Sequence, residues 1–214
     1  MRLGNNVSIR TKVIGFVIIL LVFTGAVGVV GTMGINKVNA VVAEISQVQA
    51  PAGNLLLNID RDAYQAAQAI EVLLRARTDD ERSQAIKNID DNTQQTLDRW
   101  NAYKALGSNL EGEKELQATF ERNRQTWVAS MEQVKSLGQA ATPEAIELAL
   151  PRMPALESQF QDMRDLLNQM EEMHDAESAR LAKEAEAVSA SSRQLVLLFS
   201  LVGLGFGLVL GIWL

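Results

Sequence analysis

Two long uncharged apolar blocks, one near each end of the chain, restrict its fold more than any other feature. No Asp, Glu, Lys or Arg occurs in residues 13–35 or in residues 195–214. A helix rises about 1.5 Å per residue and the hydrocarbon layer of a bilayer is about 30 Å thick, so each block is long enough to cross a membrane. A cleaved signal peptide is the alternative for the first block, but its apolar core is too long and no Ala-x-Ala-like cleavage site follows it. We therefore predict two retained transmembrane helices, residues 13–35 and 194–214.

The charges beside the first block predict its orientation. Arg2, Arg10 and Lys12 precede it without any acidic residue, and cytoplasmic flanks of membrane helices are typically positive. The whole chain has a formal net charge of −6, so the part after Lys12 is strongly acidic. We expect a cytoplasmic N-terminus at residues 1–12, a bacterial inner-membrane location, and a periplasmic segment at residues 36–193.

The composition of the chain excludes several classes of function. There is no cysteine, which rules out a disulfide framework and a cysteine nucleophile, and a single histidine, which rules out most histidine-rich metal sites. The sequence contains no phosphate-binding loop, nucleophile triad or basic nucleic-acid patch. We therefore expect no enzymatic activity, no cofactor and no nucleic-acid partner.

Apolar residues spaced three and four apart predict helices throughout the segment between the two blocks. The first stripe runs from Val38 to Leu73, and Pro51 predicts a kink within it. Thr78 and Glu81 have the spacing of a capping box for the second helix, which we expect to end at Gly107. The second stripe comprises Ile86, Ile89, Thr93, Thr96 or Leu97, Trp100 and Tyr103.

Two further long stripes and one short helix complete the segment. We expect the third helix to end near Gly138, and Thr142 with Pro143 to begin a short helix that Pro151 and Pro154 interrupt. The third stripe comprises Leu116, Phe120, Asn123, Trp127, Met131 and Val134. The last comprises Leu156, Phe160, Met163, Leu167, Met170, His174, Ser178, Leu181, Ala185 and Val188.

Four amphipathic helices joined by short links predict an all-α fold. The expected architecture is an antiparallel four-helix bundle with up-down-up-down topology, flanked by the two transmembrane helices. The first and last helices are longer than the middle two, so part of their apolar stripes lacks a partner within one chain, and we expect a homodimer. In the second membrane helix, Gly203, Gly207 and Gly211 form a small-xxx-small ladder, which suits close helix packing or reflects the common use of glycine in membrane helices.

Three short segments accompany this architecture. Residues 8–12 (SIRTK) precede the first membrane helix, residues 49–52 (QAPA) follow it, and residues 60–65 (DRDAYQ) come next. The chain resembles, over essentially its whole length, the sensor region of bacterial methyl-accepting chemotaxis receptors. The resemblance implies a periplasmic bundle dimer that binds a small ligand and passes a displacement of its last helix across the membrane. It also implies a kinase complex reached through cytoplasmic HAMP and signalling parts that are missing here; a histidine kinase or a cyclase could carry the same module.

Helix register predicts a level at which a ligand would bind. Asp62 lies about 24 Å below the turn at Thr78, and the same level on the last helix falls near Met170. Polar and charged side chains gather there: Asp60, Arg61, Asp62, Tyr64, Gln65, Arg122, Asn123, Arg124, Glu171 and His174. From these we predict a pocket for a small molecule, for example a carboxylate, in which arginines bind the carboxylate and neighbouring groups add hydrogen bonds. Its predicted members are Arg61, Asp62, Tyr64, Gln65, Arg122, Asn123 and His174.

Each of these residues also has a purely structural interpretation. The arginines can be solvated charges paired on the bundle surface, and Asn123 can be a core polar group that sets helix register. His174 can titrate near neutral pH, or it can be a buried histidine with satisfied hydrogen bonds.

Three alternative functions can be compared with the sequence. Glu171 and His174 form one Glu-x-x-His motif, but a di-metal bundle uses two, and the chain has one histidine. Haem ligation by His174 with Met131 or Met170 is chemically feasible, although these methionines also fit as core residues. A ligand-free coiled-coil tether predicts a uniformly apolar core, which the polar residues on these stripes interrupt.

Overall fold

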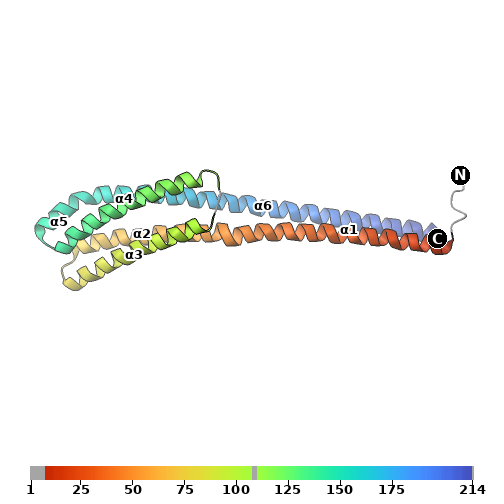
Figure 1. The fold of residues 1–214 in the computed structure, drawn as a ribbon, viewed down its shortest axis with the longest axis horizontal. Coiled ribbons are helices and arrows are strands. Elements are labelled where there is room, and N and C mark those ends of the chain that lie inside the picture. Colours follow the sequence, from red (N-terminus) through yellow and green to blue (C-terminus); the bar gives the residue numbers. More distant parts are fainter. Residues whose placement is uncertain (1–7, 108–109, 214) are drawn as a thin grey trace. The chain divides into compact units, whose positions relative to one another are not determined.

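The computed structural model describes residues 8–107 and 110–213, and it is helical almost throughout (Figure 1). The predicted cytoplasmic residues 1–7, including Arg2, lie outside the described part. The elements are α1 (Ile9–Glu44), a π-helical turn η1 (Ile45–Gln49), α2 (Ala50–Arg75), α3 (Asp79–Ala105), α4 (Glu113–Ala140), α5 (Pro143–Ala149), a 3₁₀ turn η2 (Leu150–Arg152) and α6 (Met153–Trp213). Contacts divide the chain into two compact units, one formed by residues 45–179 and the other by the two terminal segments, and each is described by itself.

The helix boundaries agree with the predicted capping residues. Thr78 Oγ1 accepts a hydrogen bond from the Glu81 amide, and the Glu81 carboxylate accepts one from the Thr78 amide, both at 3.2 Å. Gly107 adopts a φ of +71° just after α3, which is the left-handed conformation typical of a helix end. Thr142 Oγ1 accepts from the Ala145 amide at 3.2 Å at the start of α5. The capping predictions at these residues are confirmed.

The predicted break at Pro51 takes the form of a π-helical turn. Proline has no amide hydrogen and its ring crowds the carbonyl group four residues earlier, here that of Gln47. The turn at Ile45–Gln49 ends directly before α2, which carries Pro51 in its first turn. The wider π-helical turn lets the helix continue past Pro51 without the missing α-helical hydrogen bond.

Within residues 45–179, α2, α3, α4 and the first part of α6 form the predicted antiparallel four-helix bundle. Figure 1 shows α3 along α2 and α4 along α6, with α5 at one end of the bundle. Aromatic rings fill the core: the Trp100 and Phe120 ring centroids are 4.4 Å apart, and those of Trp127 and Phe160 are 6.1 Å apart. We call the end of the bundle that contains Ile45 and Ala179 the entry end, because the chain enters and leaves the bundle there.

The predicted stripe of α4 was wrong at one position, whereas the helix ends at Ala140, close to the predicted end near Gly138. Arg124, which is 8% exposed, takes the core position expected for Asn123, which is only half-buried. From Phe120 the stripe can continue three residues later, at Asn123, or four residues later, at Arg124. The long apolar stem of arginine can cover a core surface while its charged end points outward. Gly138 does not end α4, which continues to Ala140; an added Cβ there would lie 2.8 Å from Leu73 Cγ. Gly138 therefore serves close packing of α4 against α2.

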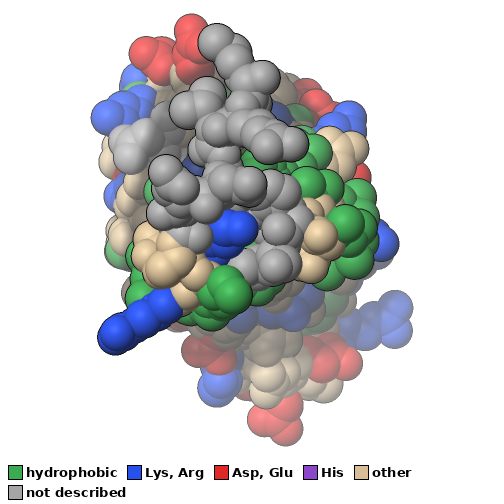
Figure 2. Space-filling view, turned by 90° about the vertical axis from the view of Figure 1, so that its right-hand side faces the viewer, with side chains coloured by type: hydrophobic (Ala, Val, Ile, Leu, Met, Phe, Trp, Pro, Cys, Tyr) green, Lys and Arg blue, Asp and Glu red, His purple; other side chains and the backbone are tan. Residues whose placement is uncertain are grey.

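The second unit contains the two apolar blocks, and both lie in helices long and apolar enough to cross a membrane. Their outer side chains are exposed; Leu21, for example, is 65% exposed. In the end-on view, hydrophobic side chains form patches beside the undescribed residues, with charged side chains of both signs around them (Figure 2). Apolar side chains exposed in this way suit helices that contact lipid.

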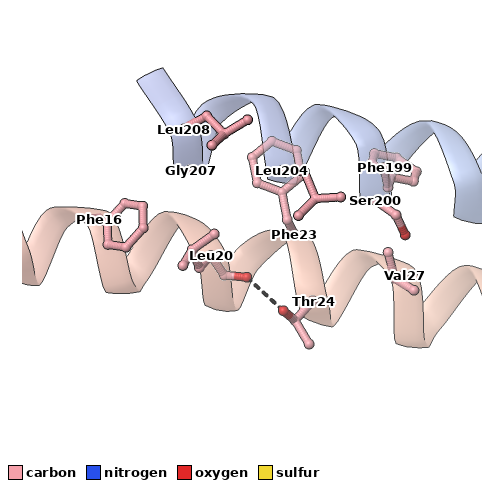
Figure 3. Close-up of a pocket in the computed structure, with 11 residues that line it drawn as sticks. Phe16, Leu20, Phe23, Thr24, Val27, Phe199, Ser200, Leu204, Gly207 and Leu208 are labelled. Atoms are coloured by element: carbon pink, nitrogen blue, oxygen red, sulfur yellow. Dashed lines mark hydrogen bonds between the residues drawn. The ribbon is translucent and has the colours of Figure 1, made fainter. Parts of the chain in front are cut away.

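The two apolar segments pack through aromatic and small residues. Phe23 of α1 lies 5.9 Å from Phe206 of α6 between ring centroids, and an added Cβ at Gly203 would touch Phe23 at 3.4 Å. An apolar groove of about 510 Å³ runs between the segments, lined on one side by Phe16 and Leu20 and on the other by Phe199 and residues after it in α6 (Figure 3). The two helices approach each other more closely at Gly34 of α1 than at the Gly203–Gly211 ladder of α6. There is no room for a Cβ at Gly34 beside Ser192 of α6.

Candidate functional site

Four buried polar side chains meet at the entry end: three lie on bundle helices and one on the π-helical turn before α2. His174 lies on α6, Gln49 closes the π-helical turn, Tyr103 lies in the last turn of α3 and Glu113 lies in the first turn of α4. None of them is more than 3% exposed. Buried polar groups are costly unless they are hydrogen-bonded, so the contacts between these four residues decide whether the arrangement is stable.

The four side chains form a continuous chain of hydrogen bonds. His174 Nδ1 lies 2.6 Å from Gln49 Oε1, and His174 Nε2 lies 3.0 Å from the Tyr103 hydroxyl oxygen. The Tyr103 hydroxyl donates to Glu113 Oε1 at 2.6 Å. Glu113 also accepts from Gln117 Nε2 at 2.9 Å and from the Leu110 amide at 3.3 Å. We call Gln49, Tyr103, Glu113 and His174 the buried polar chain.

Burial and the Glu113 carboxylate set the proton affinities of His174 and Tyr103 in the buried polar chain. Burial lowers the pKa of His174, and the negative charge of Glu113 opposes this effect in part. Burial and the hydrogen bond to Glu113 both raise the pKa of Tyr103, so its hydroxyl stays protonated and can donate. The alternative interpretation of His174 as a buried, hydrogen-bonded histidine is confirmed by these contacts.

The contacts of His174 bear on the haem interpretation. Both ring nitrogens are hydrogen-bonded, to Gln49 and to Tyr103, so neither is presented to a metal. Met131 and Met170 are buried in the apolar core, as their places on the stripes suggested. Among the described residues, no group of three His, Cys, Asp or Glu side chains is placed to hold a metal ion.

A second polar cluster lies further along α2, around Asp62. This carboxylate is completely buried; one oxygen accepts from Arg61 Nη2 at 3.1 Å, and the other forms an ion pair with Arg99 of α3. Nearby, Arg164 of α6 donates to the Asp60 carboxylate at 2.7 and 3.3 Å. The arginines of this region are therefore paired with carboxylates of the same chain.

A small groove lies between α2 and α6, next to the exposed side chain of Tyr64. It encloses about 250 Å³, and the Tyr64 and Phe160 ring centroids in its wall are 6.3 Å apart. The Tyr64 hydroxyl accepts a hydrogen bond from Gln68 at 2.8 Å. The described residues that line it include two carboxylates and no Lys or Arg: Tyr64, Ala67, Gln68, Glu71, Met153, Leu156, Glu157, Phe160 and Gln161.

The structure brings together only some of the residues predicted for the ligand pocket. Arg61 and Asp62 are in contact, and Tyr64 borders the groove. Gln65 and Arg122 are exposed, and Arg122 donates to Thr119 of its own helix at 3.1 Å. Asn123 is half-buried and lies beside the core position that Arg124 occupies.

His174 lies at a different level of the bundle from Asp62. The pair Asp60–Arg164 places α6 residues near 162 opposite Asp62, whereas the predicted register placed Met170 there. The difference of eight residues along α6 corresponds to about 12 Å. It arises because α5 and η2 occupy the far end of the bundle, so α6 begins below the α2–α3 turn. The residues of α6 that line the groove were missed for the same reason.

A comparison with protein families supports the architecture. Residues 6–189 match a family model described as a four helix bundle sensory module for signal transduction. No curated protein and no solved structure matches the chain. Because the family match extends from before the first apolar block through the bundle, the chain belongs to the four-helix-bundle sensory modules of chemotaxis receptors.

Proposed function

We propose that the chain is the input module of a twice-spanning chemoreceptor, which senses a small ligand outside the cytoplasm and transmits a displacement of α6 inward. The observation that carries this proposal is the length of α6, which runs without interruption from Met153 to Trp213. Core residues of the bundle such as Phe160 and the second apolar block therefore belong to one helix. Because a helix is stiff along its axis, a shift at one end is passed to the other.

The proposed topology places residues 1–12 in the cytoplasm, residues 13–35 and 194–214 in the inner membrane, and residues 36–193 in the periplasm. The basic side chains before the first block and the acidic character of the chain after it support this orientation. Cysteine accessibility tests it, since the natural chain has no cysteine. Glu111→Cys in intact cells should react with a membrane-impermeant maleimide, whereas Arg10→Cys should react only after lysis; the reverse pattern would invert the topology.

The groove beside Tyr64 is the proposed ligand site. It lies between α2 and α6, so a ligand there contacts the helix that carries the signal. A carboxylate ligand would have to compete with Asp60 and Asp62 for their arginines, whereas an amine can use the aromatic wall and the Glu157 carboxylate. The other lining carboxylate, Glu71, is paired with Arg75 at the exposed surface. Contacts of a ligand with Gln65, Arg122, Asn123 or His174 remain predictions from the sequence.

A thermal-shift screen of small metabolites against the full chain in lipid nanodiscs tests the site. A stabilising compound should lose its effect in Tyr64→Ala, which removes one wall of the groove. Gln65→Ala is the matched control, because Gln65 is the next residue and is exposed outside the groove. Retention of the shift in Tyr64→Ala together with its loss in Arg122→Ala would move the site to α4.

We also propose a homodimer in the membrane, with lipid around the apolar helices and a kinase complex downstream. Leu57, Tyr64 and Val72 are about half-exposed apolar side chains on α2, spaced seven and eight residues apart. This spacing keeps them near one face of the helix, where a second copy can cover them. Cysteine at position 57 should give a disulfide-linked dimer under mild oxidation, whereas cysteine at Asn101 on α3 should not.

A further inference from the structure

The hydrogen atoms of the buried polar chain can be counted. The Tyr103 hydroxyl has one hydrogen, and its shorter contact is with Glu113 at 2.6 Å. His174 Nε2, 3.0 Å from the same hydroxyl oxygen, must then supply its own hydrogen to complete that contact. Gln49 Oε1 accepts only, so the 2.6 Å contact with Nδ1 needs a second hydrogen on the ring. With these contacts, both ring nitrogens of a doubly protonated, positively charged His174 donate a hydrogen bond.

A neutral ring fits the same positions after one rotation. If the Gln49 amide turns over, its NH₂ group donates to a bare Nδ1, while Nε2 keeps its hydrogen for Tyr103. All four groups are then still hydrogen-bonded. The charge of His174 and the orientation of the Gln49 amide are therefore coupled.

Groups around His174 have opposite effects on its protonation: nearby carboxylates favour the charged ring, and burial favours the neutral ring. Glu113 of α4 lies 3.6 Å from Nε2 and favours the charged ring, as does Asp175 on the same helix. Tyr103 of α3 and Gln49 of the π-helical turn contribute no charge, and burial of the ring favours the neutral form. A group held between such opposing effects responds to a modest change in its environment.

The Gln49 side of the contact is built on irregular backbone. Gln49 is the last residue of the π-helical turn, and Pro51 lies just after it in the first turn of α2. Single π-helical turns inside α-helices are rare and frequently lie at functional sites. The contact joins the helix that enters the bundle to the helix that leaves it.

We propose that His174, Gln49 and Glu113 form a proton-operated switch at the entry end of the bundle. When His174 gains a proton, it pairs with Glu113 through Tyr103 and holds the oxygen of Gln49; when it loses the proton, the amide turns and the link between the entering helix and α6 changes. The proposed consequence for signalling rests on the proposed function, since α6 carries both His174 and the second apolar block. The proton binding itself does not depend on that function.

Nuclear magnetic resonance of the single histidine tests proton binding directly. The full chain, labelled with ¹⁵N-histidine and placed in nanodiscs, should give one titrating pair of ring nitrogens. Glu113→Gln removes the nearby negative charge, so the titration midpoint of His174 should shift to lower pH. Glu111→Gln is the matched control, because Glu111 is an exposed acid just before α4 and should leave the midpoint unchanged. A midpoint that Glu113→Gln does not move would overturn the proposal.

A second variant covers the case in which Glu113→Gln does not fold. Tyr103→Phe keeps the ring in the core but removes the hydroxyl that joins His174 to Glu113. The chemical shift of Nε2 should change, because Nε2 loses its hydrogen-bond partner. The Nδ1 signal, which reports the contact with Gln49, should still change with pH. If both ring signals in Tyr103→Phe match those of the parent chain, the buried polar chain does not form and the switch is overturned.

A crosslinking experiment tests the conformational step. Gly53→Cys on α2 and Glu171→Cys on α6 lie between the pairs Gln49–His174 and Asp60–Arg164. Their disulfide formation rate should change between neutral and mildly acidic pH, and this pH dependence should be lost in His174→Gln after correction for thiol ionisation. Titration of His174 without such a change would overturn the switch but leave the proposed ligand response standing. A topology or ligand result that contradicts the receptor would leave the proton measurements unaffected.

Discussion

Arg99 of α3 forms an ion pair with Asp62 of α2, whose side chain is completely buried. Arg61 shares the same carboxylate at 3.1 Å. Two arginines on one buried carboxylate leave a net positive charge when that carboxylate is removed. The pairing therefore ties α2 to α3 in a way that a substitution of Asp62 should expose.

Asp62→Ala should lower the free energy of unfolding by about 3 kcal/mol, because it leaves Arg99 partly buried without its counter-charge. Chemical denaturation of the full chain, followed by circular dichroism, measures the change. Asp91→Ala is the control: Asp91 pairs with Lys87 on the exposed surface of α3, and the loss should be below about 1 kcal/mol. Equal losses in the two variants would contradict the structural role of Asp62.

The stability of the bundle should fall on mild acidification because of His174. Its pKa is lowered in the folded chain, so between the folded and the ordinary value the unfolded chain binds more protons. Stability is therefore fully present above the ordinary value and is lost as pH falls toward the folded value. His174→Gln should lack this part of the pH dependence.

Thermal denaturation across this pH range, compared between parent and variant, measures the histidine contribution. Glu171, whose pKa burial and nearby acids raise, titrates in both chains, so its contribution is common to both curves. An identical pH dependence in parent and His174→Gln would show that His174 does not change its proton affinity on folding.

Gly138→Ala should destabilise the bundle by about 1–3 kcal/mol. The added Cβ meets Leu73 at 2.8–2.9 Å, and the packed core around Leu73 cannot yield freely. Gly53→Ala on α2 is the matched control, since nothing lies within 4 Å of its added Cβ. There the better helix propensity of alanine should stabilise by about 0.5–1 kcal/mol. Shifts in melting temperature of opposite sign for the two variants would support the close approach, and a neutral Gly138→Ala would refute it.

Arg124→Met should be neutral or stabilising by about 1 kcal/mol. Arg124 is almost fully buried and its Nε has no hydrogen-bond partner, while burial lowers its pKa. Methionine fills a similar volume without the cost of burying a charge, which the nearby Glu121 offsets only in part. Arg124→Ala serves as the contrast, because it leaves a cavity and should destabilise by about 2 kcal/mol or more. A strong loss in Arg124→Met would show that the terminal nitrogens of Arg124 make a stabilising contact.

Much of the candidate site depends on which helix positions face one another. The stripe of α6 was predicted through His174, and the structure buries that histidine as expected. Its partners Tyr103 and Gln49 could be suspected, because both also lie on predicted apolar faces. Glu113 could not, since nothing in the sequence marks a glutamate after a short turn as buried. The hydrogen-bonded chain appears only when the four helices are aligned.

The amino-acid sequence alone was enough for the helical fold, the ends of the helices at Thr78, Gly107 and Thr142, and the two apolar blocks. These features depend on local physics: side-chain periodicity, capping hydrogen bonds and the length of apolar runs. Tertiary packing decided the register, which places His174 beside Gln49 rather than level with Asp62, and the choice of Arg124 over Asn123 for the core. Packing decides them because a helical stripe repeats every turn, so several alignments fit the same pattern until the aromatic core and the α5 connection select one.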